Sequence, residues 1–67
     1  MILLNGESSD LRAGDTVAGV LASLGVDRDA RGVAVAVDGE VVPRSRWDAF
    51  VLPDGGRVEV LTAMQGG

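Results

Sequence analysis

The chain has 67 residues with a formal net charge of −4 at pH 7, and it contains no cysteine, histidine or lysine. It is long enough for one small domain, whose core must come from apolar packing because disulfides and the usual Cys and His ligands of zinc are absent. An acidic chain without a basic stripe is a poor candidate for nucleic-acid binding. No apolar run approaches the roughly 20 residues that span a membrane, and no signal-peptide pattern is present. We therefore expect a cytoplasmic protein that binds no metal, no nucleic acid and no membrane.

The first predicted element is a β-hairpin. Residues 1–4 form an apolar run, and the dipeptide Asn5-Gly6 follows it. Asn-Gly favours a tight hairpin turn because both residues tolerate a positive φ. We expect the second strand of this hairpin to cover residues 7–12.

A short helix is predicted next. Thr16, or Asp15 before it, can cap the helix by accepting from the first free backbone N–H groups. Gly25 stands where a left-handed C-terminal cap is expected. The apolar stripe has the spacing i, i+3, i+4 and i+7 that is typical of one helix face, and its members are Val17, Val20, Leu21 and Leu24.

A second hairpin is predicted in the middle of the chain. Residues 33–37 alternate valine with alanine, as expected for a strand with one bulky and one small face. Asp38-Gly39 provides the turn. The returning strand would contain Val41-Val42 and end before Pro43, which cannot donate a ladder hydrogen bond.

The rest of the chain is predicted to cross the domain and add one strand. Residues 44–52 show no clear period, whereas 57–62 are typical of a strand. Three side chains of the crossover should point inward: Trp47, Phe50 and Leu52. The predicted fold is α+β, a mixed sheet of about five strands packed on one main helix. We expect a domain over 1–62 and a flexible C-terminal tail over 63–67.

The predicted tail ends in Gly66-Gly67. Five extended residues reach at most about 16–18 Å, which is enough to enter the active site of another protein. A free carboxylate is an anion at neutral pH and a poor electrophile, so acyl transfer would require its activation as an adenylate. Glycine suits that chemistry because it has no Cβ to obstruct a nucleotide or a nucleophile.

Four segments together resemble the ThiS family, the sulfur carriers of thiamine biosynthesis. They are LLNGE, TVAGVLASLG, VAVAVDGEVVPRSRW and RVEVLTAMQGG, and they cover essentially the whole chain in the order of the family. The resemblance implies the ubiquitin-like β-grasp fold, which agrees with the predicted order of elements.

The resemblance also implies a protein cosubstrate that is not itself an enzyme. A ubiquitin-activating-type adenylyltransferase, using ATP and magnesium, would adenylate the carboxylate of Gly67. A persulfide sulfur donor, a cysteine desulfurase or a related protein, would convert it to a thiocarboxylate. This thiocarboxylate would donate its sulfur to thiazole synthase. The chain itself would bind no cofactor and would be monomeric when free.

Two groups of residues follow as candidates for the site. Gly66, Gln65 and Met64 belong to the tail that would enter partner active sites. Proteins of this family dock through the sheet face near the tail, so exposed apolar residues on that face would contact the partner. The candidates for docking are Leu61 and Val42, together with Met64.

Three other functions stay open at this point. The small sulfur-carrying subunit of molybdopterin synthase also has a β-grasp fold and a terminal Gly-Gly. Those chains are usually longer and tend to carry prolines where this one has TAMQ. A ubiquitin-like modifier would be joined through Gly67 to lysines of its targets. A binding module whose tail has no chemistry would tolerate the loss of Gly67.

Overall fold

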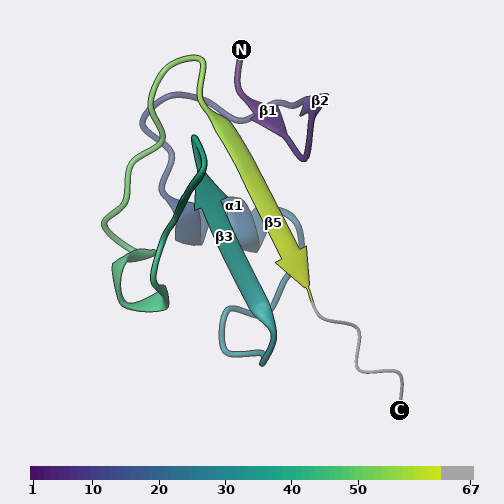
Figure 1. The fold of residues 1–67 in the computed structure, drawn as a ribbon, viewed down its shortest axis with the longest axis vertical. Coiled ribbons are helices and arrows are strands. Elements are labelled where there is room, and N and C mark those ends of the chain that lie inside the picture. The colour runs from purple at the N-terminus through teal and green to yellow at the C-terminus, as the bar shows by residue number, and fades with distance from the viewer. Residues whose placement is uncertain (63–67) are drawn as a thin grey trace.

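A five-stranded mixed sheet and one helix make up the domain, which the computed structural model describes over residues 1–62. Along the chain the elements are β1 (Leu3–Leu4), β2 (Glu7–Ser8), α1 (Val17–Ser23), β3 (Val33–Val37), β4 (Glu40–Val41), the 3-10 helix η1 (Arg44–Arg46) and β5 (Arg57–Thr62). The strand order is β2-β1-β5-β3-β4. β1 and β5 are parallel, and the other neighbouring strands are antiparallel. α1 lies behind β3 and β5 in Figure 1, so the predicted α+β arrangement is confirmed.

Both predicted hairpin turns are present. Asn5 and Gly6 have φ values of 51° and 84°, and Asp38 and Gly39 have 52° and 84°. Two successive positive φ angles form the turn that matches the twist of an antiparallel pair, and these residue types adopt them at low cost.

The second strand is shorter than predicted, because β2 ends at Ser8 and does not continue to Arg12. The hydroxyl of Ser9 donates to the carbonyl of Ile2 at 2.6 Å and accepts from the N–H of Leu11 at 3.3 Å. A side chain therefore takes over the pairing that a longer strand would have made with backbone groups.

Helix α1 begins at the predicted cap. The Thr16 hydroxyl accepts from the N–H of Gly19 at 3.1 Å, and Gly25 has a φ of 72° just after the helix. Leu24 differs from the prediction, since it is 43% exposed. The buried stripe ends at Leu21 because the helix stops at Ser23, and Leu24 falls on its C-terminal cap.

Buried side chains from both layers form one core, consisting of Ile2, Val17, Val20, Leu21, Val35, Val37, Val42, Trp47, Leu52, Val58 and Val60. Trp47 is 1% exposed, and its indole N–H donates to the carbonyl of Val42 at 2.9 Å. Leu52 is buried as well, whereas Phe50 is only partly buried. The crossover after β4 thus fills the core from the side, as predicted.

Candidate functional site

Strand β5 carries the chain through the centre of the sheet to residue 62. It pairs with β3 from Val37↔Val58 to Val33↔Thr62, and with β1 through Leu3 and Leu4. Its end lies opposite the end of the molecule that holds the β1–β2 hairpin (Figure 1). Pairing with β3 up to Thr62 fixes the position and direction from which the C-terminal segment starts.

The side chain of Asn5 extends the pairing of β5 beyond the end of β1. The N–H of Val60 donates to Oδ1 of Asn5 at 2.9 Å, and Nδ2 of Asn5 donates to the carbonyl of Val60 at 3.3 Å. β1 itself reaches only Arg57 and Val58. The side-chain amide of Asn5 therefore pairs with β5 as the backbone of one more residue of β1 would, while the backbone of Asn5 forms the turn.

The turn between β3 and β4 fixes the other end of β5. The N–H of Asp38 donates to the carbonyl of Arg57 at 2.8 Å, and the N–H of Arg57 donates to Oδ1 of Asp38 at 2.9 Å. β5 is thus bonded near both ends by residues of hairpin turns.

Exposed apolar side chains lie on the sheet face turned away from the core. Leu61 and Val41 are 66% and 74% exposed, and they surround a shallow hollow together with Ala34, Ala36 and Glu59. These five residues, which we call the outer face, alternate along their strands with residues that face the core. Leu61 is thus exposed next to the end of β5, as a docking residue requires. Val41 was missed in the sequence, although alternation from the Asp38-Gly39 turn would have indicated it.

Val42 does not belong to the outer face, so its selection as a docking candidate was wrong. It is 3% exposed. Its N–H donates to the carbonyl of Val35 at 2.8 Å, and its own carbonyl accepts from Trp47. Val41 pairs with Ala36 and shares its outward direction, so the next residue must point into the core.

The predicted tail lies outside the described residues. This applies to the proposed sulfur-bearing residue Gly67 and to Gly66, Gln65 and Met64. What the structure provides for the site is the strand that leads to them and the face beside it.

One ion pair is present within residues 1–62, between the guanidinium of Arg28 and the carboxylate of Asp48, at 2.5 and 2.9 Å. The hydrogen bond to Arg28 lowers the pKa of the Asp48 carboxyl, and the same bond raises the pKa of Arg28. In this part of the chain no group of three acidic, His or Cys side chains is placed to hold a metal ion. No helix described there has the length and apolar character needed to cross a membrane.

Comparison of the sequence with known protein families identifies the family to which the chain belongs. Residues 2–67 match the model of the ThiS family. The chain belongs to the ThiS family. The resemblance noted in the sequence is therefore confirmed over nearly its whole length.

Two curated relatives of this ThiS-family chain carry informative names. The sulfur carrier protein ThiS of Escherichia coli is 32% identical over 66 residues, which are 98% of this chain and 97% of that protein. A thiazole synthase of Paramagnetospirillum magneticum is 36% identical over 66 residues, again 98% of this chain. The chain spans only 20% of the length of that thiazole synthase.

Solved structures of a ThiS protein from Geobacter metallireducens have the same fold. The crystal structure is 35% identical, with a TM-score of 0.74 and coverage of 98% of this chain and 97% of that one. The NMR structure has a TM-score of 0.76 at the same identity and covers 98% and 86% of the two chains. The ubiquitin-like β-grasp fold is thereby confirmed for this member of the ThiS family.

Proposed function

We propose that this chain is a sulfur carrier of thiamine biosynthesis, a protein cosubstrate that other enzymes act on. The observation that carries the proposal is the end-to-end match with the sulfur carrier protein of E. coli, of which the chain covers 97%. In this proposal the carboxylate of Gly67, which follows Gly66, is the group that carries the sulfur.

The proposed chemistry takes place at the carboxylate of Gly67. A ubiquitin-activating-type adenylyltransferase joins it to AMP from ATP with magnesium, and pyrophosphate leaves. The terminal sulfur of a persulfide, carried by a cysteine desulfurase or a related donor, then displaces AMP. Cleavage of the sulfur–sulfur bond by a second thiol leaves a thiocarboxylate. ATP and magnesium belong to the activating partner, and the need for ATP and free thiols favours the cytoplasm.

The domain presents this carboxylate to its partners. Because β5 pairs with β3 up to Thr62, the tail starts from a fixed point, and five extended residues carry Gly67 at most about 16–18 Å beyond it. The outer face, with Leu61 and Val41 exposed, is an apolar surface suited to partner docking beside that point. We propose thiazole synthase as the acceptor, since one relative of that name contains a segment similar to this chain.

Intact-mass spectrometry tests the loading step. The chain is incubated with the adenylyltransferase, ATP, magnesium and a sulfide source, beside a matched chain that lacks Gly67. The proposal expects a mass gain equal to the exchange of one oxygen for sulfur in the complete chain only. If neither chain gains mass, the tail has no such chemistry and the chain is a binding module. If the chain becomes joined to lysines of other proteins, it is a modifier.

A further inference from the structure

Four of the six arginines lie in two loops that pack against each other. Residues 27–32 and 43–50 contain four Arg and three Asp, a net charge of +1. The remainder of the chain contains two Arg and seven Asp or Glu, a net charge of −5, which completes the total of −4. The negative charge of the molecule is therefore concentrated outside these loops.

Arg44 holds the two loops together. Its guanidinium donates to the carbonyls of Arg28 and, at 2.8 Å, of Ala30, and it lies 4.8 Å from the ring centre of Trp47. The Arg28–Asp48 ion pair adds a second connection. These contacts fix the backbone immediately before Arg31, so that binding has to order only the side chain of this residue.

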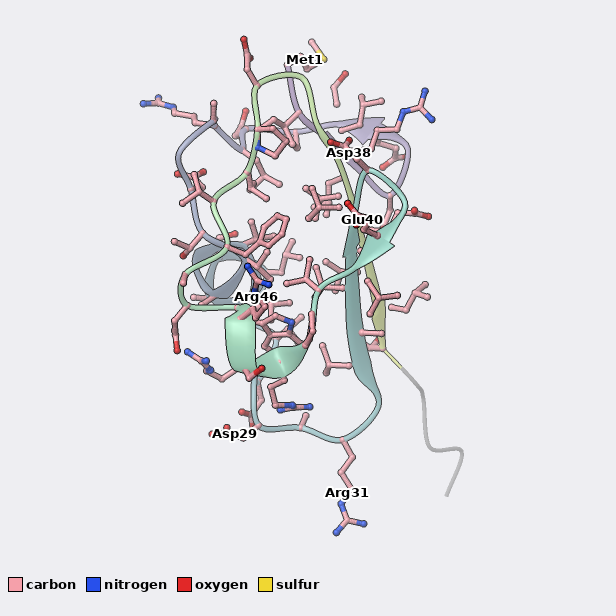
Figure 2. The ribbon with its side chains drawn as sticks, turned by 60° about the vertical axis from the view of Figure 1, so that its left-hand side comes forward. Met1, Asp29, Arg31, Asp38, Glu40 and Arg46 are labelled. Atoms are coloured by element: carbon pink, nitrogen blue, oxygen red, sulfur yellow. The ribbon has the colours of Figure 1, made fainter. Side chains whose placement is uncertain are left out.

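Arg31 is exposed at the end of the molecule where β5 finishes. It comes two residues before Val33, which pairs with Thr62, the last described residue of β5. Figure 2 shows its side chain extending away from the body of the domain, at the end opposite Met1 and Asp38. Among residues 1–62, no side chain forms an ion pair or hydrogen bond with its guanidinium.

A partner that takes Gly67 into its active site must bring its own surface against this end of the domain. The tail reaches at most about 16–18 Å beyond Thr62, so the surface around the partner's active site must come within that distance of the end of β5, beside Arg31. A guanidinium there matches the planar, bidentate geometry of a carboxylate. We propose that Arg31 is a docking residue that pairs with a carboxylate at the mouth of the tail-binding channel of the activating enzyme. This inference rests on the proposed function.

Charge reversal at two sites tests it. Arg31→Glu is compared with Arg12→Glu, which changes the net charge equally. Arg12 lies in the segment between β2 and α1, which crosses the other end of the molecule in Figure 1. The measurement is the adenylyltransferase's KM and kcat for the carrier in ATP–pyrophosphate exchange, at low and high salt, with thermal unfolding as a check on folding.

Arg31→Glu should raise the KM at least about tenfold with kcat unchanged, whereas Arg12→Glu should raise it less than about twofold. The difference should shrink at high salt. Arg31→Lys keeps the positive charge but loses the bidentate geometry, so its KM should lie between those of the unmodified chain and Arg31→Glu. Equal effects of the two reversals, or no effect of either, would overturn the role of Arg31 while the proposed function stands. If the unmodified chain supports no exchange, the proposed function fails and this inference fails with it.

Discussion

Replacing Asn5 by glycine should loosen the strand that delivers the tail. Glycine keeps the positive φ of the turn but loses both hydrogen bonds to Val60. At about 0.5–1.5 kcal/mol each, the two bonds account for about 1–3 kcal/mol of the free energy of unfolding. This is a large fraction of the roughly 3–10 kcal/mol expected for a domain of this size. Asn5→Ala should cost about 1–2 kcal/mol more, because alanine must also adopt a left-handed backbone.

Two assays follow the loss. Thermal unfolding should show a Tm lower by roughly 5–20 °C for Asn5→Gly. Amide hydrogen exchange locates the effect, because the N–H of Val60 faces Asn5 whereas those of Glu59 and Leu61 face β3. Exchange at Val60 should accelerate more than at its two neighbours. Unchanged exchange at Val60 together with an unchanged Tm would refute the idea that the Asn5 amide serves as an extra strand residue.

Three further outcomes are expected. Trp47→Phe removes the buried indole donor and should lower the free energy of unfolding by about 1–3 kcal/mol in urea titrations, with the fold retained. Leu61→Asp should change stability by less than about 0.5 kcal/mol yet weaken binding to the adenylyltransferase, measured by calorimetry; unaltered binding would exclude the outer face as a docking surface. Because Arg28 lowers the pKa of Asp48 from 3.8, the pair should stabilise the fold above that pH and lose this effect as pH falls further. Asp48→Asn should therefore be less sensitive to acid in this range than the unmodified chain.

Local patterns in the sequence were sufficient to predict the strands and turns that lead to the tail. β3 and β5 have the predicted bounds, because alternating valines specify a strand with one buried face. The dipeptides Asn5-Gly6 and Asp38-Gly39 specify their turns through positive φ angles that few residues adopt.

What the sequence could not show depends on pairing between distant residues. The hydrogen bonds of Asn5 reach a strand 55 residues away, and no local pattern indicates them. The position of Arg31 beside the end of β5 likewise follows only from the pairing of Val33 with Thr62.

Sulfur transfer to thiazole synthase is the most direct test of the account. The chain is first loaded as its thiocarboxylate and purified, then mixed with thiazole synthase and its other substrates and followed by intact mass. The account predicts that the chain returns to the mass of its carboxylate form as one equivalent of thiazole product appears. A thiocarboxylate that stays intact with thiazole synthase, but is consumed by the large subunit of molybdopterin synthase, would contradict a role in thiamine biosynthesis.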